Sequence, residues 1–290
     1  MTRTVIVGDV HGCSDELQIL LDRVGFTSSD RLVFVGDLVA RGPNSRGVLD
    51  IARRNQAQIV RGNHEDRLLS WHWAMAARAR GEFSLPPDLN RVHLDVVQTL
   101  TDEDWELLQR THVTLFMQEH STLVVHAGLV PGVSLDSQDP ATMMSIRSIG
   151  TRGEARDRGG ATPWGARWIG PPHVIFGHAA SLEPQIHPWA TGIDTGCVYG
   201  GYLTAMVLRF GEEPPPAADR QSALVSVPAR RRYFEGGAGV NGRPSSGDAS
   251  RVASGPGPRP ARRRSRWGRE SIDGQSPHRR SAGSGRGSRD

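Results

Sequence analysis

Polar side chains of the types that bind metal ions recur directly after short apolar segments of this sequence. They stand in five motifs, Gly8-Asp9-Val10-His11-Gly12, Gly36-Asp37, Gly62-Asn63-His64-Glu65, Val125-His126-Ala127-Gly128 and Phe176-Gly177-His178. A glycine in each motif lets the backbone turn sharply next to a carboxylate, amide or imidazole group. One such motif is common in ordinary turns, but five in series are typical of a metal site with oxygen and nitrogen ligands.

The apolar segments before these motifs predict buried strands, because they are short and rich in β-branched residues. Strands are expected at 5–7, 32–35, 58–60, 123–125, 174–176 and 203–208. Strands that alternate with helices predict an α/β fold. Open α/β sheets place their ligands beyond the carboxyl ends of the strands, so the polar motifs are expected to meet at one edge.

Helical patterns lie between the early strands. The first is expected around one apolar face, with Ser14 as its N-cap and Leu17, Leu20, Leu21 and Val24 on that face. Further helices are expected from residue 48, over 65–80 and after Thr101, where three acidic residues suit the first turn of a helix. The Gly- and Arg-rich stretch 150–160 is expected to be a surface loop.

Composition divides the chain into a folded body and a tail. Residues 1–212 are predicted to form the catalytic domain and 213–235 an extension with an edge strand at 223–227. From residue 236 to 290, Gly, Ser, Pro and Arg dominate, so this tail is expected to be disordered. The tail contains 12 Arg against 4 acidic residues, a formal +8, whereas the whole chain is +4; the body is therefore about −4. Contact of the tail with nucleic acid is an alternative to a solvated extension.

The remaining composition favours a cytoplasmic protein. The chain has two cysteines, Cys13 and Cys197, too few for a disulfide framework, and both are expected to be small packing residues. The N-terminus runs directly into the first strand and leaves no room for a signal segment. No apolar run approaches the roughly 20 residues that span a bilayer, so no membrane contact is expected.

The series of motifs resembles the calcineurin-like metallophosphoesterases, in the branch that contains phosphoprotein phosphatases and symmetrical diadenosine tetraphosphate hydrolases. The resemblance covers roughly residues 4–209. It implies a four-layer αββα sandwich with a dimetal site at the carboxyl ends of the strands. It also implies a set of metal ligands, in which Asp37 bridges both ions: Asp9 and His11 for the first ion, and Asn63, His126 and His178 for the second.

The same resemblance implies the chemistry of the site. His64 resembles the general acid of the family, and Arg41 and Arg147 resemble its phosphate-binding arginines. Two divalent cations, two carboxylates and neutral ligands leave the bare site about +2, which favours a phosphate anion over a neutral substrate. Paired cations lower the pKa of a bridging water towards about 7, which makes hydroxide available for attack on phosphorus. Ligands without thiolate suit Mn, Fe, Zn or Co, and Mn is the expected ion.

One position distinguishes two substrate classes. Phosphoprotein phosphatases usually carry Asp where this chain has Ala40, and that Asp orients the catalytic histidine. The string Gly36-Asp37-Leu38-Val39-Ala40-Arg41-Gly42-Pro43 instead resembles the diadenosine tetraphosphate hydrolases, as does Asp194-Thr195-Gly196-Cys197. A nucleotide is a better leaving group than a serine alkoxide, so cleavage of a phosphoanhydride needs less help from a general acid.

Hydrolysis of dinucleoside polyphosphates is therefore the first functional hypothesis. A Ser/Thr phosphoprotein phosphatase is the alternative, because the stretch between Arg147 and Val174 has no evident nucleotide-binding segment. A non-catalytic scaffold that binds partners through its tail is a third hypothesis, which the complete ligand set disfavours. The partner that orients His64 in the absence of an acidic residue at position 40 is left open. The other histidines, among them His93, have no ligand-like context in the sequence.

Overall fold

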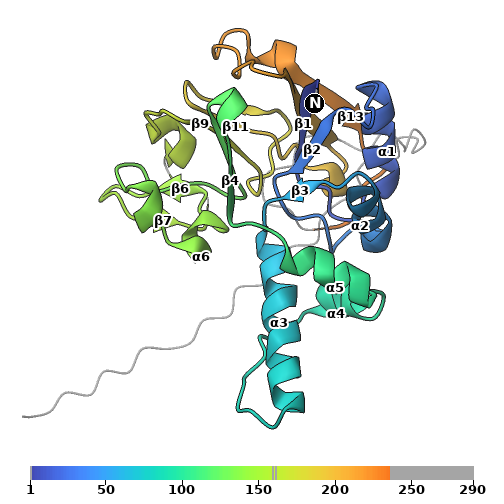
Figure 1. The fold of residues 1–290 in the computed structure, drawn as a ribbon. Coiled ribbons are helices and arrows are strands. Elements are labelled where there is room, and N and C mark those ends of the chain that lie inside the picture. Colours follow the sequence, from blue (N-terminus) through green and yellow to red (C-terminus); the bar gives the residue numbers. More distant parts are fainter. Residues whose placement is uncertain (1, 159, 161, 236–290) are drawn as a thin grey trace, which may run out of the picture. The chain divides into compact units, whose positions relative to one another are not determined.

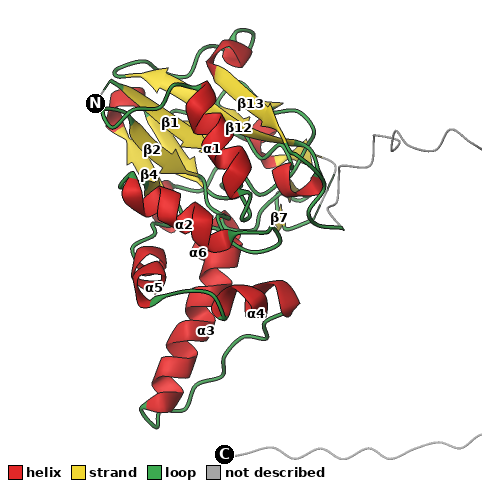
Figure 2. Ribbon diagram, turned by 90° about the vertical axis from the view of Figure 1, so that its right-hand side faces the viewer, coloured by secondary structure: helices red, strands yellow, loops and turns green. Residues whose placement is uncertain are grey.

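The computed structural model of the protein describes residues 2–158, 160 and 162–235, and two five-stranded mixed sheets form the centre of this part (Figures 1 and 2). In the first sheet three parallel strands are flanked by an antiparallel pair. Its order is β13 (Leu224–Pro228), β12 (Tyr202–Arg209), β1 (Arg3–Val7), β2 (Arg31–Phe34) and β3 (Gln58–Ile59). The first strand of the chain therefore lies beside one of the last.

The second sheet also has parallel strands at its centre and antiparallel strands at its edges. Its order is β10 (Gln185–Ile186), β11 (Ala190–Gly192), β9 (His173–Phe176), β5 (Thr122–Val125) and β4 (Thr114–Met117). A small third sheet contains β6 (Ser148–Ile149), β7 (Ala155–Arg156) and β8 (Thr162–Pro163). The stretch 150–160 is thus a loop only in part, since β7 forms a hairpin with β6.

Alternate residues of each strand face different apolar layers, as expected for strands buried on both faces. Ile6 of β1 packs in the same buried cluster as Val124 of β5, between the two sheets. Val5 and Val7 instead face the cluster that contains the helices of the first sheet. Leu123 and Val125 face a third cluster on the far side of the second sheet. The predicted four-layer α/β sandwich is confirmed, with short elements in its fourth layer.

Helices α1 (Ser14–Arg23) and α2 (Ser45–Arg54) cover the outer face of the first sheet. Ser14 is the first helical residue of α1 and not its N-cap, which is Cys13; the hydroxyl of Ser14 accepts a hydrogen bond from Asn44 instead. Helix α2 begins before the predicted residue 48, because the Asn44 side chain caps it by accepting the N–H of Gly47 at 2.9 Å.

Three further helices form a lobe that projects from the sheets, and α3 (Asn63–Ala79) extends furthest from them (Figure 1). The others are α4 (Arg91–Val97) and α5 (Asp102–Gln109). The helix expected after Thr101 is present, and Thr101 is its N-cap, since its hydroxyl accepts the N–H of Asp104 and the Asp104 carboxylate accepts the N–H of Thr101. The short helix α6 (Pro140–Met143) lies against the second sheet.

The extension after residue 212 returns to the first sheet, where β13 forms its edge and pairs with β12. The domain boundaries at residues 212 and 236 stay predictions. The tail 236–290, with its expected disorder and nucleic acid contact, lies outside the described residues. Among the described helices, not one is both long and apolar enough to cross a bilayer.

Candidate metal and phosphate site

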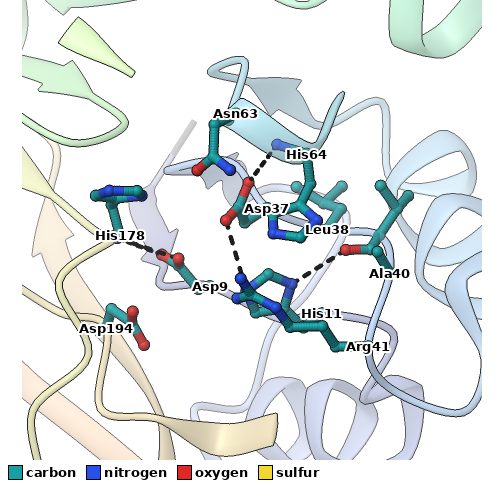
Figure 3. A network of polar contacts seen from close by, with 12 residues as sticks. Asp9, His11, Asp37, Leu38, Ala40, Arg41, Asn63, His64, His178 and Asp194 are labelled. Carbon is teal, nitrogen blue, oxygen red and sulfur yellow. Dashed lines mark hydrogen bonds and ion pairs between the residues drawn. The ribbon is translucent and has the colours of Figure 1, made fainter. Parts of the chain in front are cut away.

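The predicted ligands converge at the carboxyl ends of the parallel strands. Asp9 and His11 follow β1, Asp37 follows β2, and His126 and His178 follow the central strands β5 and β9. Asn63 opens α3 directly after β3. Figure 3 labels five of these side chains, all except His126, together with Asp194 from the turn after β11, around one common space. His126 joins them, since its Nε2 lies 3.5 Å from Oδ2 of Asp37 and 3.2 Å from Oδ1 of Asn63. The structure therefore brings together all six residues that the sequence singles out.

The turns that carry these residues have an unusual backbone. Seven non-glycine residues in the described part of the chain have φ in the left-handed region, and five of them belong to this site: His11, Asp37, Ala40, Arg41 and His178. Such conformations are costly for residues with a Cβ atom and persist where the surrounding structure imposes them. Their concentration here indicates that the turns are held in place for function.

The carboxylate of Glu65 holds the turn after β2 against the start of α3. It accepts four backbone N–H groups, from Asp37, Leu38, Val39 and Gly62, at 2.8 to 3.2 Å. Glu65 is fully buried, and burial raises its pKa to about 7. Close packing of the same turns excludes side chains, because a Cβ atom on Gly62 would lie 2.2 Å from Oδ1 of Asp37.

Two histidines present an unprotonated imidazole nitrogen toward Asp37. Nδ1 of His11 donates to the carbonyl of Val39 at 3.1 Å, and Nδ1 of His126 donates to that of Val35 at 2.9 Å. In both rings this leaves the Nε2 lone pair 3.5 Å from Oδ2 of Asp37. Burial lowers the pKa of His126 to about 4 and that of His11 well below its usual value, so both rings are neutral and able to bind a cation.

Three buried carboxylates repel one another in this space. The pKa of Asp9 is raised well above its usual value, first by burial and then by the charges of Asp194 and Asp37. Burial also raises the pKa of Asp37, to about 7, and that of Asp194. Both oxygens of Asp9 accept the backbone N–H of His178 at 3.1 Å. Asp37 and Asp194 each accept one backbone N–H as well, from His64 and Gly196. These few hydrogen bonds do not balance three buried negative charges, and a divalent cation would.

The donor set fits metal ions in its geometry as well as in its charge. Donor atoms of Asp37, His126 and His178 lie within 4.8 Å of one another, and so do those of His11, Asp37 and His64. Asp37 belongs to both groups and therefore stands between them. Nε2 of His126 also lies 3.2 Å from Oδ1 of Asn63. Because Nδ1 carries the His126 proton, two acceptors face one another there, an arrangement that a shared cation satisfies.

His64 lies beside this space with an unpaired nitrogen. Its backbone N–H donates to Oδ1 of Asp37 at 3.1 Å, and its Nδ1 is buried without a hydrogen-bond partner among the described residues. Burial lowers the pKa of His64 well below its usual value, and His11 and Arg41 lower it further. The ring stacks on that of His93 from α4. No sequence motif pointed to His93, and only the tertiary packing of α4 on α3 places it here.

Arg41 is held over the site by aromatic side chains. Its guanidinium carbon lies 5.7 Å from the ring centroid of Tyr199 and 5.8 Å from that of Phe234, within range of a cation–π interaction. Its NH1 donates to Nε2 of His11 at 2.8 Å. Phe234 belongs to the segment after β13, which docks through hydrogen bonds from the N–H groups of Tyr233 and Phe234 to Val198.

Arg147 reaches the site from the far side, between α6 and β6. Its charge lowers the pKa values of Asp37, His126 and His178. It also lines a cavity of about 520 Å³ with Ala180, Ser181 and Gln185, among other residues. Small-molecule sites commonly enclose about 300 to 1,000 Å³. Arg147 thus connects the ligand cluster, whose pKa values it lowers, with a cavity of suitable size for a phosphorylated ligand.

Sequence patterns missed three buried residues of this site. Asp194 follows β11, which has three residues and no long apolar run that would mark a strand. Glu65 stands in a recognised motif, but its partners lie 26 to 28 positions away along the chain. His93 carries no local signal at all. Each acquires its role through contacts between segments that are distant in sequence.

Comparisons with known proteins agree with this arrangement. A family model described as calcineurin-like phosphoesterase matches residues 2–205. Bis(5'-nucleosyl)-tetraphosphatase PrpE [asymmetrical] of Halalkalibacterium halodurans is 30% identical over 244 residues, which cover 78% of this chain and 94% of that protein. A symmetrical bis(5'-nucleosyl)-tetraphosphatase of Chromohalobacter salexigens is 30% identical over 268 residues, which cover 72% and 96%.

Among solved structures, one of a candidate diadenosine tetraphosphatase is similar over most of both chains. It is 32% identical to this chain, with a TM-score of 0.64, and the match covers 79% of this chain and 94% of that one. The similarity therefore extends over nearly the whole length of these relatives, sheets and strand-end turns included.

Proposed function

Because the chain belongs to the calcineurin-like phosphoesterase family and its relatives are named tetraphosphatases, we propose that it hydrolyses a phosphoanhydride bond of dinucleoside tetraphosphates. The observation that carries the proposal is the convergence of six oxygen and nitrogen ligands on one space flanked by two arginines. The family is one of metal-dependent hydrolases, and the donor set described above fits divalent metal ions.

We assign the ligands in two groups that share Asp37. Asp9, His11 and Asp37 would hold one cation, and Asp37, Asn63, His126 and His178 the other. Asp37 belongs to one donor group with His11 and to another with His126 and His178, which supports its shared position. Asp194 stands close enough to raise the pKa of Asp9 and adds negative charge to the first group. Oxygen and nitrogen ligands suit Mn²⁺, which we propose as the resident ion in the cytoplasm.

When bound, the cations would supply an activated water as nucleophile and neutralise charge on the phosphate. The chain's own residues would do the rest. Arg41 and Arg147 present guanidinium groups, which bind phosphate oxygens through paired N–H bonds. A cation on Nε2 of His11 would take the lone pair that Arg41 occupies in this structure, and Arg41 would then be free to turn to the substrate.

His64 would donate a proton to the leaving oxygen. Because the environment lowers its pKa, a protonated His64 gives up its proton readily, although it carries one less often at neutral pH. A leaving nucleotide is a weak base and tolerates this arrangement, whereas a serine alkoxide needs a full proton transfer. Ala40 supplies no polar side chain to hold the ring. These properties favour phosphoanhydrides over phosphoserine as substrates.

The test uses the full-length protein stripped of metal by a chelator and restored with Mn²⁺, offered diadenosine tetraphosphate, a phosphoserine peptide and an aryl phosphate. We expect diadenosine tetraphosphate to have the highest kcat/KM. Products identify the bond that is cleaved, since two ADP indicate symmetrical cleavage and ATP with AMP indicates asymmetrical cleavage. A preference of more than about a hundredfold for the phosphopeptide, some 2.7 kcal/mol in transition-state stabilisation, would contradict the proposal.

Matched variants check that the metal site performs the reaction. Asp37→Asn removes the shared carboxylate charge, so we expect turnover to fall at least a hundredfold and bound metal to decrease. Asp22→Asn changes an exposed carboxylate on α1 and should leave both unchanged. Full turnover by Asp37→Asn would show that the reaction does not depend on this site.

A further inference from the structure

Two cysteines and a glutamate that take no part in the phosphoesterase site meet beside its first turn. Cys13 directly precedes α1, Glu16 lies in the first turn of α1, and Cys197 follows the turn after β11. Both Sγ atoms and a carboxylate oxygen of Glu16 lie within 4.8 Å of one another. At most 1% of each residue is exposed. The sequence separates the two cysteines by more than 180 positions, so only the fold reveals this cluster.

The charge of Glu16 is not balanced within the described part of the chain. Its Oε1 accepts the Tyr233 hydroxyl at 2.7 Å and the N–H of Arg230 at 2.9 Å. Its Oε2 is buried and has no hydrogen-bond partner among the described residues. No described Arg or His side chain forms an ion pair with it. A buried carboxylate oxygen without a hydrogen-bond partner destabilises the fold. Both Sγ atoms lie within 4.8 Å of a carboxylate oxygen of Glu16.

We propose that Cys13, Glu16 and Cys197 form a binding site for a thiophilic divalent cation such as Zn²⁺. Thiolate ligands select soft metals, and two thiolates with one carboxylate are three of the four ligands of a tetrahedral zinc site. At Zn–S distances of about 2.3 Å the two sulfurs would stand about 3.8 Å apart. Sulfurs at the observed limit of 4.8 Å would need to approach by about 1 Å, a small change for two side chains.

A divalent cation can replace the two thiol protons without a change in the net charge of the cluster. The pKa of the Cys197 thiol is raised well above its usual value by a hydrogen bond with Cys13 and by burial, so this thiol is protonated when no cation is bound. Two neutral thiols and one carboxylate carry −1. A divalent cation with two thiolates and one carboxylate also carries −1, and the two thiol protons leave to solvent. The cation therefore adds no net charge to a buried region.

A cavity beside Glu16 offers room for a fourth ligand. A cavity of about 290 Å³ is lined by Glu16, Arg230 and Tyr233, among other residues. This volume is ample for a water molecule, which needs about 30 Å³. Water in this cavity would complete four-coordination. The cation would also connect the turn of Asp9 and His11 to the turn of Asp194, because Cys13 and Cys197 belong to those two turns.

Cobalt reports this site separately from the catalytic one, since the catalytic ligands contain no sulfur. Reduced full-length protein would be loaded with Co²⁺, and thiolate-to-cobalt charge transfer would be followed in the near ultraviolet. We expect one equivalent of Co²⁺ to produce this band, and Zn²⁺ to abolish it. The band should persist in Asp37→Asn, disappear in Cys197→Ser, and require at least tenfold more Co²⁺ in Glu16→Gln.

Several outcomes would overturn the proposal: no charge-transfer band although both thiols react with a thiol reagent after unfolding, a band of equal strength in Cys197→Ser, or a disulfide in the protein as purified from reducing buffer. Circular dichroism of Cys197→Ser and Glu16→Gln would verify that these variants fold. The Tm provides a second measurement, made with the phosphoesterase site weakened by Asp37→Asn: Zn²⁺ should raise the Tm of Asp37→Asn more than that of the double variant Asp37→Asn with Cys197→Ser. None of these readouts requires phosphoesterase activity, so a failure of the proposed function would leave them interpretable.

Discussion

The imidazole of His93 stacks on that of His64, with ring centroids 4.8 Å apart and planes inclined by 24°. Nδ1 of His93 is hydrogen-bonded to the Asn90 side chain, which fixes the orientation of the ring. Nε2 of His93 and Nδ1 of His64 are both buried without partners among the described residues. His93 therefore provides a packing surface for the ring of His64, and Ala40 has no polar side chain that could orient this ring.

Replacement of His93 by Leu should loosen His64 and lower kcat by about tenfold, equivalent to about 1.4 kcal/mol, for substrates with poor leaving groups. Activated aryl phosphates should be affected less, because their leaving groups need little proton donation. The loss of proton donation can be measured with a series of aryl phosphates whose leaving groups differ in pKa. The decrease of kcat with rising leaving-group pKa should be steeper for His93→Leu than for the parent. His72→Leu, which alters a ring stacked on Trp105, is the control. Equal slopes for parent and His93→Leu would exclude an orienting role.

The pKa of Asp37 makes stability of the metal-free protein depend on pH. Burial raises the folded-state pKa from 3.8 to about 7, so the favourable contribution of the protonated carboxyl is complete below about pH 4 and is lost as pH rises through 7. Asp37→Asn cannot ionise. With a chelator present, its free energy of unfolding relative to the parent should increase between pH 5 and 8 by about 2.6 kcal/mol, nearly all of it below pH 7. Urea unfolding at each pH measures the difference, and added Mn²⁺ should remove it.

Two truncations separate the tail from the segment that holds Arg41. Removal of 236–290 should leave hydrolysis of a small substrate unchanged. Removal of 229–290 also deletes Phe234, one of the two rings beside the Arg41 guanidinium, and should raise KM for diadenosine tetraphosphate at least severalfold. Phe234→Ala in the full chain should reproduce the larger effect, while Phe234→Tyr should not. Loss of activity in the shorter deletion of 236–290 would assign a catalytic role to the tail instead.

A methyl group at residue 177 should disrupt the site from within. A Cβ atom on Gly177 would lie 1.9 Å from Oδ1 of Asp9, so Gly177→Ala must displace this carboxylate or the turn that carries His178. We expect bound metal to fall by about one equivalent and turnover by at least a hundredfold. Gly25→Asn is the control, because Gly25 has open space around it and Asn tolerates its φ of 60°. Elemental analysis measures the metal content of each variant. An unchanged metal content in Gly177→Ala would contradict the predicted displacement of Asp9 or His178.

The metal ligands at the strand ends could be predicted from the sequence because each is marked by residues close to it along the chain. An apolar run, a glycine and a ligand residue stand within a few positions of one another, as at Val35, Gly36 and Asp37. The sheet edge then brings separate runs together without further information. The same locality explains why the start of α5 after Thr101 is correctly predicted, since Thr101 and its partner Asp104 are three residues apart.

Features that depend on distant contacts could not be predicted in this way. Ser14 is of a residue type that often forms an N-cap, but its hydroxyl accepts a hydrogen bond from the side chain of Asn44, which is distant in sequence. From its position in the sequence, Glu65 is an ordinary acidic residue in the first turn of a helix. Only the folded structure brings the N–H groups of residues 37–39 to its carboxylate. Burial raises the pKa values of Asp9 and Asp194, and burial is a property of the assembled molecule.

The pairing of β1 with β12 has a consequence for synthesis of the protein. Arg3 is opposite Arg209, and Val7 is opposite Ala205. During synthesis, β1 therefore leaves the ribosome about two hundred residues before β12, the strand with which it pairs. Until then β1 has one open edge, and a nascent chain that stops short of β12 exposes this edge to other chains. Assembly of the domain is therefore a late event in translation, and shortened products are expected to aggregate.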